Sequence, residues 1–429
     1  MPERQSLDQP AVDQPAVDQR GRRRVAVTGM GVVTPAGSEL AGFWSTLLAG
    51  ESVAAPITRF DASAHPVDGA CEVRDFDPAA LLGVKEARRT DRVAQLGLAA
   101  ASDALADAGA LAADPARCAV VSGTGVGGLE TLEDQIGLAV AKGVERVSPF
   151  LIPMMMPNAT AGLLALTFGW TGPNLCVTTA CAAGTHAIGE GARLVRDGSA
   201  EVVLAGGCEA AITPVAMAAF HRMGALSSRG DLRSASRPFD IGRDGFVMGE
   251  GAAFLVLEDF ERATARGARI HGEVLGYGRT CDAHHITAPA PGGAGAVACM
   301  QLAIDDAGLA PDAVGHVNAH GTSTPLNDAA EAEAVTKVFG ERSVPVTSTK
   351  GVTGHLIGAA GAAEAVAALF ASRHGLLPPT ASHAQADDDM TIDVVAGEPR
   401  ELPGGVGAPA LSNSFGVGCH NASLVLTGS

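Results

Sequence analysis

The sequence predicts an α/β protein with a parallel or mixed core sheet. Short apolar runs rich in β-branched residues alternate along the chain with longer, alanine-rich stretches of helical pattern. This alternation is typical of strands that are covered by helices. The strand candidates are Cys118–Ser122, Val202–Ala205, Ala253–Leu257, Val314–Ala319, Val344–Ser348 and Ser423–Thr427. The helix candidates are Arg92–Gly109, Thr185–Asp197, Ala294–Gly308, Ala329–Phe339 and Ala359–His374.

A weak internal repeat is the second observation behind this prediction. A helix candidate ending in Asp107-Ala108-Gly109 is followed by a linker, a strand candidate and the glycine turn Ser122–Gly125. The same order and nearly the same spacing recur at Asp306-Ala307-Gly308 and the turn Ala319–Thr322. A duplicated α/β unit leaves such a pattern. We therefore expect two similar halves, with chance similarity between alanine-rich helices as the alternative.

Composition is typical of an enzyme of a reducing, cytoplasmic environment. Eight cysteines are scattered along the chain without a CxxC pair, which argues against a disulfide framework or a zinc knuckle. No stretch of about 18 apolar residues predicts a membrane span. A formal net charge of −17 would repel nucleic acid and anionic lipid. An anionic partner must therefore meet a local basic patch.

The N-terminus predicts a mobile tail over residues 1–23, with structure beginning at Arg24. It carries no signal-peptide pattern. Instead it contains a polar, proline-punctuated near-repeat, Asp8–Gln14 and Asp13–Gln19. Such a segment buries too little apolar surface to offset its ordering entropy.

Cys181 is the candidate nucleophile. The β-prone stretch Leu175–Thr179 runs into small residues and then into a helical pattern. This order predicts that the sulfur lies at a strand-to-helix turn over a helix N-terminus. There, unpaired N–H groups and the helix dipole favour the thiolate. The alternative is a small buried core residue, which most intracellular cysteines are.

Two histidines in the second half lie in comparable turns. His320 stands where the apolar run Val317–Ala319 breaks into a Gly/Thr/Pro turn, and His355 lies in the Gly- and Thr-rich loop Thr347–Gly361. Functional side chains are often placed on such loops at strand ends. Together with a turn cysteine, the two histidines indicate a nucleophilic site. The neighbours His284 and His285 lack a further ligand at convincing spacing, so we predict no metal site.

These motifs, in this order, resemble the elongating β-ketoacyl-acyl-carrier-protein synthases of type II systems, including the ketosynthases of type II polyketide synthases. The resemblance covers the chain from Arg24 to Leu426. The motifs that carry it are Thr178–Cys181, Ala205–Gly207, Ser236–Asp240, Arg243–Phe246, Asn318–Thr324, Lys350–Glu364 and Ser412–Gly416. It implies a thiolase fold: duplicated α/β halves in a layered α-β-α-β-α architecture with mixed sheets. The nucleophile would belong to the half 24–269 and both histidines to the half 270–429.

The resemblance implies an acyltransferase of fatty-acid or polyketide biosynthesis. Cys181 would carry the acyl group and condense it with malonyl-acyl-carrier protein in a decarboxylative Claisen reaction. His320 and His355 would donate Nε2–H groups to the malonyl thioester oxygen, because the enolate needs positioned donors. The backbone N–H groups of Cys181 and Phe415 would form the oxyanion hole, and Phe415 would also act as a gate.

The supporting roles follow from the same resemblance. Lys350 would hold and polarise the histidine pair, and Glu364 would be a buried carboxylate that supports it. The hydroxyls of Thr322 and Thr324, assisted by Thr287, would bind the phosphopantetheine arm, which the carrier protein brings as part of the substrate, so no resident cofactor is expected.

The expected partners are an acyl carrier protein and a second subunit. The basic run Lys85, Arg88 and Arg89 aligns with the family's carrier-docking helix; by itself it also fits a solvated helix face. The second subunit would complete a homodimer, or a heterodimer with a chain-length-factor-like protein.

The sequence also departs from the family pattern. Val417, Cys419 and His420 replace residues of the usual glycine-rich end and could reshape the gate loop. Met154–Met156 either line an unusual acyl pocket or fill core space. A catalytically dead relative is disfavoured because Cys181, His320 and His355 are all present. A degradative thiolase is also disfavoured, because such an enzyme would have a second cysteine in place of one histidine. Cys419 beside His420 is the only feature that favours this alternative.

Overall fold

The computed structural model describes residues 17–429. Most of the expected mobile tail, residues 1–16, lies outside the described residues. The rest of that prediction differs from the structure, because residues 17–23 form an ordered turn. Val17 and Arg23 pair in a β-bridge, and the Arg22 guanidinium donates to Asp18 at 2.8 Å and to Asp306 at 2.6 Å. These ion pairs attach the turn to the second half of the chain.

Within residues 17–429, eleven strands form one mixed sheet in the order β12-β10-β9-β14-β15-β8-β1-β7-β6-β4-β5. The strands of the first half are β1 (Val25–Val33), β4 (Cys118–Gly123), β5 (Asn174–Val177), β6 (Val202–Glu209) and β7 (Gly251–Asp259). Those of the second half are β8 (Gly272–Cys281), β9 (His316–Asn318), β10 (Pro345–Thr347), β12 (Asp393–Val394), β14 (Ala410–Gly416) and β15 (His420–Gly428). The halves join where β1 and β8 pair over two residues.

The two halves repeat one topology, which confirms the predicted duplication. The order β1-β7-β6-β4-β5 corresponds to β8-β15-β14-β9-β10, and the pairing directions match in both, with two antiparallel pairs followed by two parallel ones. Even the close helix contacts recur. A Cβ on Gly31 would lie 2.0 Å from the Ala100 carbonyl, and one on Gly278 would lie 2.1 Å from the Cys299 carbonyl. Glycine at these positions lets a helix pack directly on the strand backbone.

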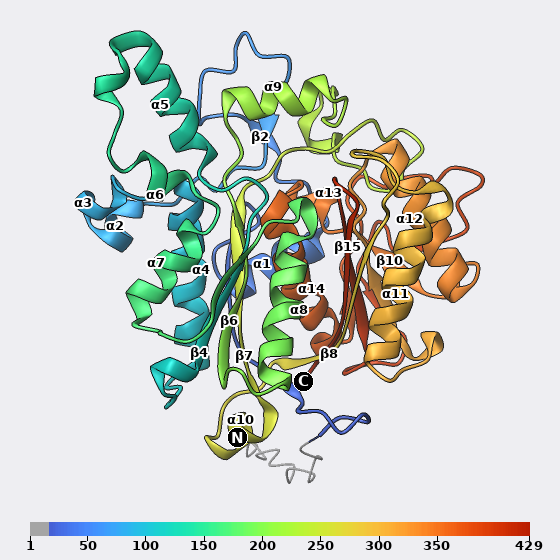
Figure 1. Cartoon of the computed structure of the whole chain (residues 1–429). Coiled ribbons are helices and arrows are strands. Elements are labelled where there is room, and N and C mark those ends of the chain that lie inside the picture. The colour runs from blue at the N-terminus through green and yellow to red at the C-terminus, as the bar shows by residue number, and fades with distance from the viewer. Residues whose placement is uncertain (1–16) are drawn as a thin grey trace, which may run out of the picture.

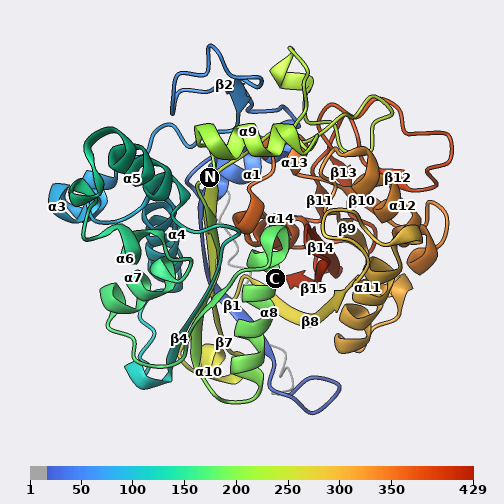
Figure 2. The ribbon, with the colours of Figure 1, turned by 45° about the horizontal axis from the view of Figure 1, so that its top comes forward.

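The helices complete the five layers that the resemblance implies (Figures 1 and 2). The middle layer consists of α8 (Ala183–Arg196) and α14 (Ala360–His374), which lie between the two arms of the sheet. The outer layer of the first half holds α4 (Arg92–Ala108) and α7 (Ala159–Phe168), and that of the second half holds α11 (Ala294–Asp306) and α12 (Pro325–Phe339). The largest apolar cluster joins α8, α14 and the strands on both sides. Burial of this shared core orders the two central helices against each other.

The remaining helices and short strands lie outside these layers. They are α1 (Leu40–Ala49), β2 (Ala55–Pro56), β3 (Gly69–Ala70), α2 (Pro78–Leu82), α3 (Val84–Ala87), α5 (Leu129–Lys142), α6 (Leu151–Met155), α9 (Pro214–Arg222), α10 (Phe260–Ala265), α13 (Lys350–Thr353), β11 (Leu376–Leu377) and β13 (Arg400–Glu401). Among residues 17–429, no helix combines the length and the apolar character needed to cross a membrane.

All of the strand and helix candidates named above fall on observed elements, with shifted ends. The strand expected at Val314–Ala319 is reduced to β9, because a 3-10 turn over Pro311–Ala313 ends at Val314. Helix α12 begins four residues before its predicted start, at Pro325. Proline suits the first helical position, since the N–H that it lacks would have no partner there.

Candidate active site

Cys181 lies at the predicted strand-to-helix turn. Strand β5 ends at Val177, a 3-10 turn spans Ala180–Ala182, and α8 begins at Ala183. Ala180 has φ 51°, in the left-handed region that costs a residue with a side chain about 1 kcal/mol or more. This strained turn presents the Cys181 side chain, which is 7% exposed.

His320 and His355 come from the second half and meet this cysteine. His320 follows β9, and His355 follows α13 after Gly354. Both are 2% exposed, and their rings meet edge to face with centroids 5.4 Å apart. One ligand-type atom from each of Cys181, His320 and His355 lies within 4.8 Å of the others. The tertiary structure thus brings together the three residues that the sequence singled out.

The hydrogen bonding of His355 indicates its tautomer. The Ile357 backbone N–H donates to Nδ1 at 3.3 Å, so the proton of the neutral ring belongs on Nε2. Nε2 is buried and has no hydrogen-bond partner among the described residues. It is therefore a free donor. Three such side chains could suggest a metal site, but a protonated Nε2 is not a metal ligand, and the predicted absence of metal remains our expectation.

Lys350 and Glu364 form a buried ion pair beside the histidines. Lys350 is 0% and Glu364 2% exposed, and the ammonium donates to the Glu364 carboxylate. Burial and the Lys350 charge hold the pKa of both His320 and His355 well below its ordinary value, with His355 adding to the effect at His320. Both imidazoles are therefore neutral near pH 7.

The environment of the Cys181 sulfur corrects one sequence expectation, the favoured thiolate. The backbone N–H of Val417, two residues beyond Phe415, hydrogen-bonds this sulfur. Burial raises the pKa of Cys181 to about 11, and it outweighs the opposing effects of the Val417 N–H and the Lys350 charge. A thiolate favoured in the resting site was thus a wrong prediction, because burial removes the water that would solvate the anion. The flanking glycines Gly416 and Gly418 were the available signal for a tight turn at Val417.

A cavity of about 390 Å³ opens onto these groups. Its lining includes the three convergent side chains and also Thr287, Thr322 and Thr324. The hydroxyls of Thr322 and Thr324 hydrogen-bond each other at 2.9 Å. The Phe415 side chain lines the cavity as well, and its ring centroid lies 6.1 Å from that of His320. The Phe415 ring therefore lies beside the proposed nucleophile, as expected, and the role of the Phe415 backbone N–H stays a prediction.

Glu331 is a functional candidate that sequence reasoning missed. It is 1% exposed and accepts the backbone N–H groups of His320 at 2.8 Å and Gly321 at 2.7 Å. Nothing in the sequence marks this carboxylate, because it lies inside the ordinary helical pattern of α12.

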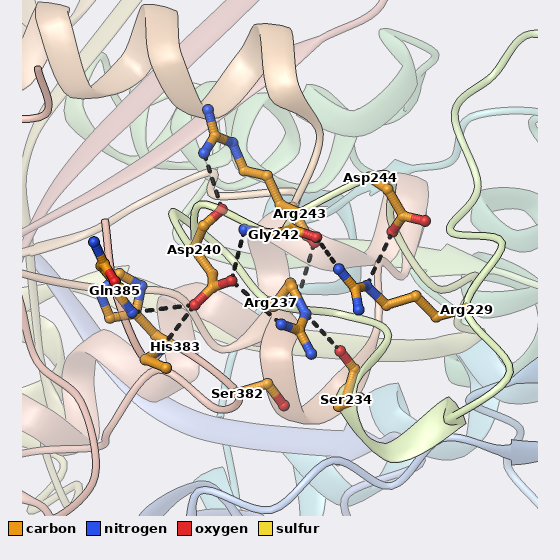
Figure 3. A network of polar contacts seen from close by, with 12 residues as sticks. Arg229, Ser234, Arg237, Asp240, Gly242, Arg243, Asp244, Ser382, His383 and Gln385 are labelled. Atoms are coloured by element: carbon orange, nitrogen blue, oxygen red, sulfur yellow. Dashed lines mark hydrogen bonds and ion pairs between the residues drawn. The ribbon is translucent and has the colours of Figure 1, made fainter. Parts of the chain in front are cut away.

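The motif from Ser236 to Asp244 forms a polar network with neighbouring loops, and Figure 3 shows the part of this network around Asp240. Asp240 lies at its centre and accepts from the backbone N–H groups of Gly242 and Ala384, each at 2.8 Å, and from the Arg237 side chain. The Arg237 backbone N–H donates to Ser323, and the Ser236 hydroxyl donates to the Lys350 carbonyl at 2.6 Å. The motif thus supports the segments that carry the cavity hydroxyls and Lys350.

The basic run lies on α3 and the turn that follows it, outside the cavity lining. Lys85 and Arg88 are exposed. Arg89 is half-buried, because its guanidinium stacks 4.7 Å from the Phe150 ring centroid and pairs with Glu86 at 3.4 Å. Met154–Met156 lie in and just after α6, also outside the cavity lining.

These features define a class of enzyme: a thiolase-fold condensing acyltransferase whose cavity brings one buried thiol together with two neutral imidazoles. Family models agree with this class. Beta-ketoacyl synthase, N-terminal domain, matches residues 22–263, and Beta-ketoacyl synthase, C-terminal domain, matches residues 271–384. The chain belongs to the beta-ketoacyl synthase family.

Individual relatives extend over almost the whole chain. The chain is 48% identical to 3-oxoacyl-[acyl-carrier-protein] synthase 2 of Synechocystis sp., over 94% of its own length and 97% of the relative's. Among solved structures it resembles the ishigamide ketosynthase/chain length factor, with a TM-score of 0.89, 37% identity, and coverage of 95% of this chain and 100% of the other. It also resembles a chain in the structure of a type II polyketide synthase acyl-carrier protein in complex with its ketosynthase bound to the hexaketide. The TM-score is 0.86 and the identity 29%, with coverage of 95% of this chain and 100% of the other.

Proposed function

We propose that this chain extends acyl chains by decarboxylative condensation of an acyl group on Cys181 with a malonyl unit on an acyl carrier protein. The observation that carries the proposal is the approach of Cys181, His320 and His355 to within 4.8 Å of one another at one cavity. This arrangement supplies a nucleophile and donors for an enolate oxygen at one place.

The first step is transfer of the acyl group. The Cys181 sulfur attacks the thioester carbonyl of the acylated carrier, a sulfur–carbon bond forms, and the bond to the arm's sulfur breaks. The proton of the Cys181 thiol ends on the departing arm thiol. The backbone N–H groups of Cys181 and Val417 would donate to the oxyanion of this step, because the Val417 N–H hydrogen-bonds the sulfur beside which that oxygen forms.

The second step is loss of carbon dioxide from the malonyl thioester. The carboxylate leaves as CO₂, and its electron pair forms a thioester enolate. The Nε2–H of His355, which is free in the structure, would donate to the enolate oxygen, and His320 would supply the second donor. Because burial and the Lys350 charge lower the pKa of both rings and keep them neutral, they would stabilise the enolate without transferring a proton to it.

The third step joins the two parts. The enolate carbon attacks the carbonyl of the acyl-Cys181, and the resulting oxyanion would be held by the same two N–H groups. Collapse of this intermediate breaks the bond between the carbonyl carbon and the Cys181 sulfur and releases a β-ketoacyl thioester on the carrier. The Cys181 thiolate that leaves takes up one proton from solvent and becomes the thiol again. No resident cofactor is needed for these bond changes, and the phosphopantetheine arm belongs to the carrier substrate.

The carrier would approach through the cavity that Thr287, Thr322 and Thr324 line, with their hydroxyls binding the arm. Lys85 and Arg88 are the exposed cations of the proposed docking patch, and Arg89 would contribute through its guanidinium edge beside Phe150. An acidic carrier would be steered by such a patch despite the net negative charge.

A heterodimer with a chain-length-factor-like subunit is the second candidate assembly, beside a homodimer. It is supported by the likeness to the ishigamide ketosynthase/chain length factor. Strand β5 ends the sheet, and an unpaired edge strand invites pairing with another chain. Exposed apolar side chains gather on neighbouring elements: Ile136 and Val140 on α5, Ile152 on α6, Leu166 on α7 and Leu175 on β5. We place the enzyme in the cytoplasm, where reduced cysteines persist.

Mass spectrometry tests the proposed reaction. After incubation with acyl-carrier protein, wild-type protein should gain the acyl mass on the peptide containing Cys181, and Cys181→Ala should gain none. Malonyl-carrier protein should then yield CO₂ and a β-ketoacyl-carrier. Acylation at another residue would refute the assignment. Co-expression with a cysteine-lacking ketosynthase-like partner, followed by analytical ultracentrifugation, distinguishes the two assemblies.

A further inference from the structure

Glu209 is a buried carboxylate placed between loops of the two halves. It ends β6 and is 0% exposed. From the first half it accepts the Thr124 hydroxyl at 3.0 Å and the Gly125 backbone N–H at 2.6 Å. From the second half it accepts the Gly358 backbone N–H at 3.1 Å. A single carboxylate therefore links the turn after β4 to the turn that follows His355.

The two turns are packed without room for adjustment. A Cβ on Gly358 would lie 2.4 Å from the Gly125 nitrogen, and one on Gly125 would lie 2.7 Å from the Glu209 carboxylate and 2.8 Å from Ile357. Ile357 itself has φ 47°, a left-handed conformation that a β-branched residue adopts only when its surroundings enforce it. The Glu209 contacts are part of what enforces it.

The strained residue is also the one that orients the His355 ring. The Ile357 N–H donates to Nδ1 of His355 and keeps the ring proton on Nε2. Gly358, held by Glu209, is the next residue. Movement of this turn would therefore release Nδ1 and remove the fixed Nε2–H donor.

We infer that Glu209 is a positioning residue for His355: its carboxylate holds the Ile357–Gly358 turn against the first half, and this keeps the Nε2–H of His355 directed into the site. The inference rests on the proposed function for its readout. Acyl transfer to Cys181 uses the thiol and the backbone N–H groups, whereas decarboxylation of the malonyl thioester uses the histidine donors. Loss of Glu209 should therefore slow one half-reaction and spare the other.

Glu209→Gln tests the inference, because glutamine keeps the shape but replaces one accepting oxygen by an amide nitrogen that faces backbone N–H groups. Acylation of Cys181 by acyl-carrier protein, followed by mass spectrometry, should stay within about threefold of wild type. Release of CO₂ from malonyl-carrier protein by the acylated enzyme should fall by about 10²-fold, the usual cost of losing one oxyanion donor. Equal loss in both half-reactions, or loss in neither, would overturn the inference.

Two further variants make the result interpretable. Glu258→Gln is the matched control, since Glu258 is also 0% exposed but lies at the opposite end of the β6–β7 pair, with Thr28, Arg262 and Arg266. It should leave both half-reactions unchanged. Gly125→Ala adds a methyl group that would collide with Glu209 and Ile357 from the first half. It should also reduce CO₂ release while sparing acylation, even if Glu209→Gln does not fold. A wild-type enzyme that failed to acylate Cys181 would instead refute the proposed function.

Discussion

Cys181 and His355 occupy equivalent positions in the two halves of the molecule. Cys181 follows β5 and precedes α8, and His355 follows β10 and precedes α14. Strands β5 and β10 are corresponding strands, and α8 and α14 are the two helices of the middle layer. Because the two helices pack against each other, the turns before them meet. The duplication thus builds a site from two copies of one turn, one carrying the thiol of Cys181 and the other the imidazole of His355.

The contact between the two middle helices should be sensitive to a single methyl group. A Cβ on Gly184 would lie 2.9 Å from both the Ala362 nitrogen and the Gly358 carbonyl. Because backbone atoms cannot move aside without a large cost, Gly184→Ala should lower the free energy of unfolding by about 1–3 kcal/mol. It should also lower kcat for condensation by at least the factor by which it raises KM. Urea unfolding and steady-state kinetics measure both. Gly42→Ala, a helical glycine with open space around it, is the control.

The backbone N–H of Val417 should contribute more to the rate of condensation than the Val417 side chain does. Val417→Pro removes the donor and should lower kcat for condensation by about 10²–10³-fold, whereas Val417→Ala keeps it and should lose only a few-fold. Thermal melts by circular dichroism establish that both variants fold. Equal rates for the two variants would contradict the assignment of this N–H to the oxyanion hole.

Alkylation of Cys181 should show the raised pKa of the thiol. Since burial raises the pKa of Cys181 to about 11, its thiolate fraction grows tenfold per pH unit between pH 7 and pH 10. The rate of iodoacetamide labelling at this cysteine, followed by peptide mass spectrometry, should rise in proportion. A rate that levels off below pH 9 would show that the resting site favours the thiolate after all. Lys350→Met should slow labelling further, because the Lys350 charge lowers the pKa of Cys181.

Charge reversal at the docking patch should weaken carrier binding in a salt-dependent way. Arg88→Glu should reduce affinity for an acidic carrier protein by about 3- to 10-fold at low salt, and the loss should shrink as salt screens the patch. Isothermal titration at two ionic strengths measures it. Lys337→Glu, an equal charge change on α12 of the second half, should have no such effect. Unchanged affinity in Arg88→Glu would show that the basic run is a solvated helix face and not a docking patch.

The ion pairs of the N-terminal turn should stabilise the fold above about pH 4. Burial raises the pKa of Asp306, but the hydrogen bond from Arg22 and the charges of Arg196 and Arg22 lower it by more. The net result is a pKa below the ordinary value. A carboxyl group with a lowered folded-state pKa stabilises the protein above its unfolded pKa of about 3.9, and this stabilisation is lost as pH falls through the folded value. Asp306→Asn should therefore be less stable than wild type in urea at pH 7, and the difference should shrink near pH 3. A constant difference would contradict this account.

Local sequence signals were sufficient to select candidate site residues that lie in a single turn. The break from apolar strand to glycine and threonine marked His320 and His355, and small residues before a helical pattern marked Cys181. Such signals do not show which backbone N–H reaches another segment. The N–H that hydrogen-bonds the Cys181 sulfur belongs to Val417, because this depends on where β14 stops and the turn begins.

The sequence by itself determined the α/β class, the duplication and the three side chains that converge at the cavity, since periodicity and turn chemistry are properties of neighbouring residues. The tertiary structure decided the rest. Glu209 could not be singled out, because its partners at Gly125 and Gly358 lie far from it along the chain. The protonation of Cys181 also depended on the whole site, because burial by residues from both halves outweighs the local N–H groups. Interactions between distant segments are set only when the core packs.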